Sequence, residues 1–203
     1  MSKMQSSILT PKTKFPHKKT KSPDIRNLVE SVFFQPIPTL NSSEELEPIS
    51  LAVITFKDWG PDVNCFENLT WENQPAAFLA KLGVFYMTII GQGSSYHHGL
   101  YGPVPVHSHS DREAYLFGFS VYDDSIKDKR ANGTAYSILT VFFPKSLKNV
   151  LHSSRETINK LLSRVIGEIE NIDQLTPKSL EEIKEILKEG VFYHNTLSTS
   201  FVS

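Results

Sequence analysis

The chain has 203 residues, which is enough for one domain with a buried core and flanking segments, but cramped for two. Hydrophobic content of 39% and charged content of 21% are ordinary for a globular protein, and a net charge of −1 predicts no general attraction to nucleic acid. The single cysteine excludes an internal disulfide and a cysteine-based zinc site. No stretch approaches the roughly 20 apolar residues of a membrane span, and the N-terminus lacks the apolar run of a signal peptide. We therefore expect a cytoplasmic protein.

The N-terminal part of the chain is basic and polar. Residues 1–27 carry six lysines before the first acidic residue, Asp24. Such a segment buries too little apolar surface to offset the entropy of ordering, so we expect a disordered tail with at most weak contact to acidic membrane lipid. Residues 28–49 read as a linker, in which apolar residues within 28–34 favour a short helix before three prolines stop regular structure.

A folded domain is predicted over residues 50–190. Residues 50–56 read as a first strand and residues 62–66 as a second strand returning beside it. The turn between them contains Gly60 and Pro61, two residue types that favour turns.

Residues 74–90 have the apolar spacing of a helix and are followed by Gly91, a typical residue after a helix. Their near-continuous apolar content predicts that this helix lies against a sheet. A strand over residues 84–90 is the competing interpretation.

Three more strands are expected next. Residues 101–106 contain two prolines and therefore belong at a sheet edge. Residues 114–122 and 136–143 alternate like half-buried neighbouring strands that flank a polar loop. The expected core includes a group of aromatic side chains, and both tryptophans are expected to serve packing or an interface. The aromatic group is Phe117, Phe119, Phe142 and Phe143.

Two helices complete the predicted domain. The spacing of apolar residues over 154–169 predicts an amphipathic helix, with Ser153 and Glu156 placed for a capping box. A last helix is expected to start at Pro177 and to end at Gly190, followed by a polar C-terminal tail over residues 191–203.

Three stretches of the chain carry a family resemblance, in order and at near-constant spacing. They are residues 51–56 with Gly60-Pro61, residues 102–119, and residues 119–125 with Arg130 and residues 136–140. Over residues 50–170 the chain resembles the longin domains of folliculin and of the nitrogen-permease-regulator-like proteins. The resemblance implies an α+β, longin (profilin-like) fold with a five-stranded antiparallel sheet flanked by helices. Relatives usually continue into a DENN module, so this chain resembles a free-standing longin.

The resemblance implies binding to a small Ras-like GTPase and stimulation of its GTP hydrolysis, with a dimeric assembly of two copies or with another longin or roadblock-type protein. Arg112 matches the arginine finger of the regulator-like proteins, and Arg130 matches that of folliculin, in a loop about two residues longer than folliculin's. The structural alternative for either arginine is a solvated charge held by a neighbouring carboxylate. Asp111 and Glu113 are the neighbours of Arg112, and Asp123, Asp124 and Asp128 those of Arg130.

Two other functions compete with this reading. One is a scaffold or trafficking adaptor without a catalytic arginine. The other is a zinc-dependent hydrolase, because His107 and His109 with Ser120 and Asp123 resemble the ligand motif of JAMM isopeptidases, although the spacing is too long. We expect no bound metal. No Walker-type glycine loop is present, so no nucleotide or other cofactor is expected either.

Overall fold

The computed structural model describes residues 49–91, 96–127 and 132–200, with side chains through Val191. The predicted tail 1–27 and nearly all of the linker 28–49 lie outside these residues. The strands are β1 Ser50–Lys57, β2 Gly60–Glu67, β3 Gly99–Val106, β4 His109–Tyr122 and β5 Thr134–Pro144. The helices are α2 Pro75–Ile90, α3 Lys148–Ser153, α4 Arg155–Gly167 and α5 Pro177–Ser200, with short 3-10 turns η2 Lys145–Leu147 and η3 Ile172–Gln174.

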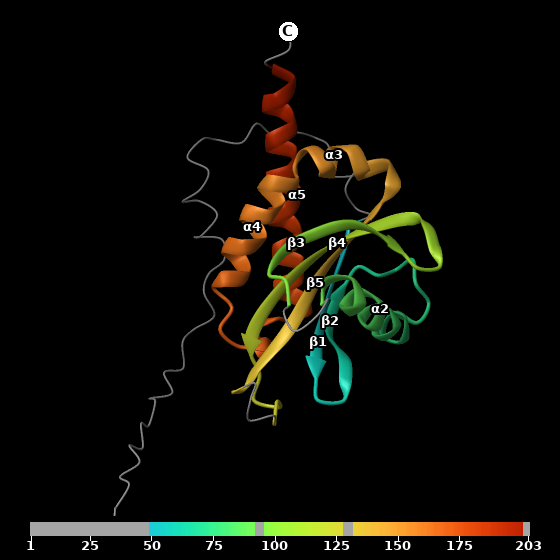
Figure 1. Ribbon diagram of the computed structural model, residues 1–203. Coiled ribbons are helices and arrows are strands. Elements are labelled where there is room, and N and C mark those ends of the chain that lie inside the picture. The colour runs from blue at the N-terminus through green and yellow to red at the C-terminus, as the bar shows by residue number, and fades with distance from the viewer. Residues whose placement is uncertain (1–48, 92–95, 128–131, 201–203) are drawn as a thin grey trace, which may run out of the picture.

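The five strands form one antiparallel sheet in the order β2-β1-β5-β4-β3. This confirms the α+β class and the five-stranded antiparallel sheet (Figure 1). The two central hairpin strands, β4 and β5, are paired from Arg112↔Pro144 to Tyr122↔Thr134. As predicted, β3 lies at a sheet edge, where the missing N–H groups of its prolines break no central ladder.

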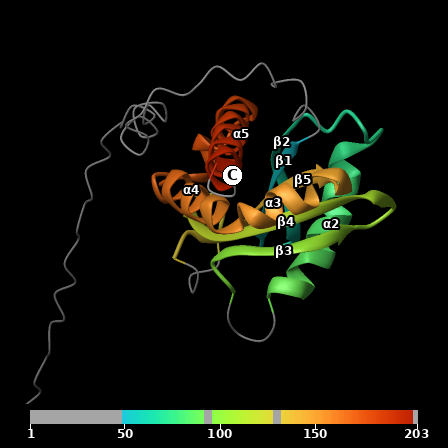
Figure 2. The same cartoon turned by 90° about the horizontal axis from the view of Figure 1, so that it is seen from above.

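Helices cover both faces of the sheet. Figure 2 shows α4 and α5 on one side and α2 on the other. Residues 113–119 of β4 and 135–143 of β5 are consequently all buried, so the prediction of half-buried strands is wrong for this pair. Alternate residues of both strands point to opposite faces, and each face packs against a helical layer, so both sets are buried.

The aromatic group expected in the core is buried, with every side chain at most 5% exposed. Phe117, Phe119 and Phe143 pack on the side of α4 and α5, whereas Phe142 packs on the side of α2. The sheet therefore separates two apolar clusters, and this confirms the predicted core residues.

Helix α2 confirms the helical interpretation of residues 74–90, and the competing strand is wrong. Leu79, Leu82 and Tyr86 recur at helical spacing and are buried against the sheet. Gly83 permits the close approach, because a Cβ there would lie 2.8 Å from Pro61 and 2.9 Å from Ile54.

The capping box predicted for the amphipathic helix is wrong. Helix α4 begins at Arg155, and its N-cap residue Ser154 makes no side-chain capping hydrogen bond. Ser153 instead ends the preceding helix α3 and donates its hydroxyl to the Val150 carbonyl. The short helix α3 was not anticipated, and it displaces the cap.

The last helix does not end at Gly190. Helix α5 runs to Ser200, so residues 191–200 continue the helix instead of forming a tail. A Cβ at Gly190 would lie 2.3 Å from Leu161 Cδ1 in α4, which places this glycine at a close helix contact and not at a helix end. No helix within the described part of the chain is long and apolar enough to cross a membrane.

Candidate functional site

The two candidate arginines of the sequence belong to opposite ends of strand β4. Arg112 lies near the start of this 14-residue strand, and Asp123 follows directly after its end. Arg130 falls in residues 128–131, outside the described structure, between Lys127 and Asn132. The described flanks of its loop therefore lie at one end of the sheet and Arg112 lies toward the other.

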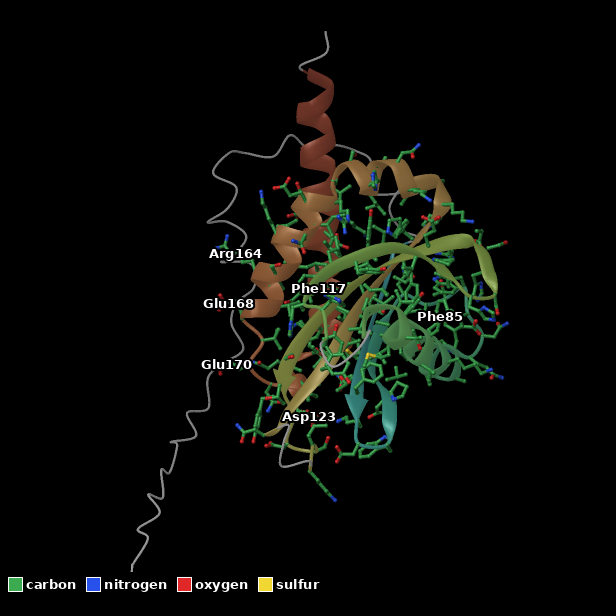
Figure 3. The ribbon with its side chains drawn as sticks, in the orientation of Figure 1. Phe85, Phe117, Asp123, Arg164, Glu168 and Glu170 are labelled. Atoms are coloured by element: carbon green, nitrogen blue, oxygen red, sulfur yellow. The ribbon has the colours of Figure 1, made fainter. Side chains whose placement is uncertain are left out.

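The first of these places is the loop end, which we define by Lys57, Asp58, Trp59, Asp123 and Ser125. Figure 1 shows the β1–β2 turn and the loop after β4 at the same end of the sheet, and Figure 3 labels Asp123 there. Lys57 Nζ lies 2.5 Å from Asp123 Oδ2 and 2.6 Å from Ser125 Oγ. The side chains of Lys57 and Asp123 are only 11% and 4% exposed, so this ion pair is largely buried.

Asp123 organises both described flanks of the loop. Its Oδ1 accepts hydrogen bonds from the Ser125 backbone N–H at 2.8 Å and from the Ser125 hydroxyl at 2.6 Å. Its own N–H donates to the Gly133 carbonyl at 2.8 Å. Burial by itself would raise the pKa of Asp123, but the hydrogen bonds from Lys57 and Ser125 outweigh it and hold that pKa below the ordinary value. Asp123 is therefore ionised at neutral pH.

Exposed aromatic side chains lie at the loop end, around the ion pair of Lys57 and Asp123. Trp59, in the β1–β2 turn, is 69% exposed, and Tyr122, at the end of β4, is 48% exposed. The turn also contacts the loop, because Asp58 Oδ2 accepts a hydrogen bond from the Lys127 backbone N–H at 3.3 Å. Exposed Trp and Tyr side chains on a rigid backbone are typical anchors of protein interfaces.

The second place is the arginine–tryptophan end, which we define by Arg112, Trp71, Glu72 and His109. The Arg112 guanidinium carbon lies 4.5 Å from the centre of the Trp71 ring, and Arg112 Nε lies 3.8 Å from Asp111 Oδ2. Its side chain is 13% exposed. Burial lowers the pKa of Arg112, while the charge of Asp111 opposes that shift. Arg112 thus rests on the protein's own aromatic ring.

Trp71 is itself fixed from several sides. Its ring packs edge to face against Phe78, with centroids 5.6 Å apart, and against His109 at 4.8 Å. Its indole N–H donates to Ser50 Oγ at 2.9 Å. Packing was one of the two roles expected for this tryptophan, but its contact with Arg112 has no signal in the local sequence.

His109 and Glu72 complete this end of the sheet. His109 Nε2 lies 3.0 Å from Glu72 Oε2. The pKa of Glu72 is lowered, first by the backbone N–H of Gln74 and then by its hydrogen bond to His109.

The carboxylates named as alternative partners of the arginines divide between the two ends. Asp111 does contact Arg112, as that alternative expects. Glu113 instead pairs with Lys148 at 2.8 Å, and Asp123 pairs with Lys57. No local pattern predicts either lysine as a partner, because both come from other elements.

The histidine motif that resembles a zinc site is not brought together. His109 bonds to Glu72, whereas Ser120 bonds to His98 Nε2 at 2.9 Å. Asp123 lies beyond the far end of β4, next to Lys57. Within the described residues, no group of three or more His, Cys, Asp or Glu side chains is placed to hold a metal ion.

Comparison of the chain with models of protein families, with curated proteins and with solved structures found no match. The function proposed below therefore rests on the motifs in the sequence and on the geometry of the two ends of the sheet.

Proposed function

We propose that this protein contains a longin-type domain that binds a small Ras-like GTPase through the loop end and stimulates GTP hydrolysis. The observation that carries the proposal is the element order. The chain forms two strands, a helix, three strands and then further helices. The strands make one five-stranded antiparallel sheet with helices on both faces. The resemblance implies this arrangement.

Arg130 is the preferred catalytic residue in this proposal. A finger inserted from a partner needs an accessible guanidinium without a permanent partner, and it stabilises the charge of the transferring phosphoryl group by roughly 10³ to 10⁵ in rate. The loop that contains Arg130 follows Asp123, which the ion pair with Lys57 holds in place. The exposed Trp59 belongs to the same end of the sheet. Because the start of the loop is held in place, the Arg130 side chain has fewer positions to sample. This supports the assignment of Arg130 as the catalytic residue.

Arg112 is the second candidate. Its guanidinium has to leave Trp71 before it can reach a nucleotide, and the protein loses the cation–π contact in that step. This geometry also supports the rival function, a scaffold that binds a GTPase without supplying an arginine.

The proposal includes assembly with a second longin or roadblock-type protein, or with a second copy, through a sheet edge. We assign this pairing to β2. The other edge strand, β3, contains Pro103 and Pro105, which lack N–H donors. In addition, Asn159 accepts from the Leu100 N–H at 3.0 Å, and Arg155 donates to the Leu100 carbonyl at 3.1 Å, so side chains of α4 already occupy β3 there.

The test is complex formation with a panel of small GTPases in three states: bound to GDP, to a non-hydrolysable GTP analogue, and to GDP with aluminium fluoride, which mimics the transition state. A finger protein binds the aluminium fluoride state much more tightly than the others. We expect Arg130→Ala to remove this preference and to retain binding to the GTP state. Equal binding of the GTP-analogue state and the aluminium fluoride state by wild type, Arg112→Ala and Arg130→Ala favours the scaffold. No binding to any GTPase contradicts the proposal.

A further inference from the structure

A groove runs between helix α2 and the β3–β4 turn, at the end of the sheet opposite the loop end. It consists of two adjoining hollows of about 390 Å³ and 460 Å³. Phe85, His107 and Ser108 line both hollows, so the two are continuous. Figure 3 labels Phe85 on the outer side of α2, away from Asp123.

The walls of the groove combine an apolar floor with two lysines and one carboxylate, Glu72 of the first hollow, which is paired with His109. Phe78 and Leu82 line the first hollow, and Phe85, which is 44% exposed, lines both. Lys81 lines the first hollow and Lys145 the second. Both lysines are exposed, and neither forms an ion pair within the described residues. The groove therefore suits an apolar side chain with acidic neighbours.

The chain enters the described structure beside this groove. The Ile49 carbonyl accepts a hydrogen bond from Asn68 at 3.2 Å, and Ser50 Oγ accepts one from Trp71. Trp71 packs directly on Phe78 of the groove floor. Ser50 also pairs with Phe142 of β5, so the nearby Lys145 lies at the same end of the sheet.

The residues just before Ile49 have the chemistry that the groove requires. They read Glu44-Glu45-Leu46-Glu47, a single leucine among three glutamates. An extended chain spans at most about 3.6 Å per residue, so Leu46 can reach roughly 14 Å from Ser50. The contacts that lead from Ser50 to the groove floor are shorter than that reach, because the Trp71 indole N–H donates to Ser50 Oγ at 2.9 Å and the Trp71 and Phe78 ring centroids are 5.6 Å apart.

We propose that residues 44–47 of this chain bind in the groove, with Leu46 on the apolar floor and the glutamates toward Lys81 and Lys145. A tether this short gives the segment an effective concentration in the millimolar range, so modest contacts suffice for occupancy. The proposal is independent of GTPase binding, because the groove and the loop end lie at opposite ends of the sheet.

The experiment is disulfide trapping in the full chain. Leu46→Cys is combined with Ala77→Cys, an exposed position that lines the first hollow. The matched control combines Leu46→Cys with Ser163→Cys, an exposed position on α4 across the sheet. The native Cys65 is buried and stays in place. We expect the first pair to form an intramolecular disulfide at least about tenfold faster than the control.

Charge reversal tests the role of the lysines in the same assay. Lys81→Glu with Lys145→Glu should slow trapping, and reversal of the three glutamates to lysine in that background should restore it. All positions are exposed or lie outside the described residues, and a thermal melt of each variant confirms folding. Equal trapping by both cysteine pairs overturns the proposal, as does a disulfide that forms only between two chains. Trapping unchanged by charge reversal overturns the assigned role of the lysines.

Discussion

The loop end and the arginine–tryptophan end of the sheet hold their charged side chains by different physical means. At the loop end a largely buried ion pair, Lys57 with Asp123, fixes the backbone and leaves the aromatic residue Trp59 exposed. At the other end an aromatic ring, Trp71, holds the charged residue Arg112. For Arg112, the surroundings decide how available the guanidinium is, because its side chain lies on the Trp71 ring and is only 13% exposed.

The largest effect is expected from Asp123→Asn, which leaves the Lys57 charge buried without its partner. Removing one member of a buried ion pair costs about 3–5 kcal/mol, so the free energy of unfolding should fall by that amount in urea denaturation. The double variant Lys57→Met with Asp123→Leu should be more stable than Asp123→Asn. A loss of less than about 1 kcal/mol for Asp123→Asn, the range of an exposed pair, contradicts the buried anchor.

The same pair predicts a pH dependence. Because the pKa of Asp123 is lowered on folding, its contribution to stability is present above the unfolded value of 3.8 and is lost as pH falls through the lower folded value. Urea denaturation of wild type and Asp123→Asn from pH 7 to pH 2 should show a constant difference down to about pH 4 that then shrinks. A difference that stays constant to pH 2 contradicts this assignment.

A smaller loss is expected from Arg112→Ala. The guanidinium loses its cation–π contact and the buried stem loses packing, so stability should fall by about 1–2 kcal/mol. The proposed function requires an Arg130 side chain without a permanent partner, so it predicts that Arg130→Ala changes stability by less than about 0.5 kcal/mol. A double-mutant cycle of Arg112→Ala with Trp71→Phe measures the coupling. Equal losses for the two arginine variants would remove the contrast between the ends.

The smallest effect concerns the Glu72 carboxyl at the arginine–tryptophan end. Its pKa should lie below 4.5 in an NMR titration. His109→Ala should raise it only in part, because the backbone N–H of Gln74 is the larger cause of the shift. A full return to the ordinary value in that variant would assign the shift to His109 alone.

Local patterns were sufficient to predict the order of the main elements. Helical spacing predicted α2, and alternation with two prolines placed β3 at an edge. Patterns fail where a distant element decides the outcome. Gly190 looks like a helix terminus in the sequence, but the methyl group of Leu161 in another helix explains the glycine.

The candidate site was predictable only in part, for the same reason. The motifs selected Arg112 and Arg130 from their order along the chain. Arg112 contacts its neighbour Asp111, as one alternative expected, but its ring contact comes from Trp71, on a separate loop before α2. The anchor of the other loop comes from Lys57 in β1. Side chains that meet across a sheet leave no local pattern, so the contrast between the two ends emerges only in the fold.

Single-turnover GTP hydrolysis by a GTPase that binds this protein tests the central claim most directly. The wild-type chain, Arg112→Ala, Arg130→Ala and Arg130→Lys are compared at saturating concentration. The proposed function predicts that Arg130→Ala abolishes a stimulation of roughly 10³ to 10⁵, that lysine rescues poorly because it lacks the planar fork, and that Arg112→Ala retains the stimulation. Stimulation that survives Arg130→Ala and is lost in Arg112→Ala would contradict the assignment of catalysis to the loop end.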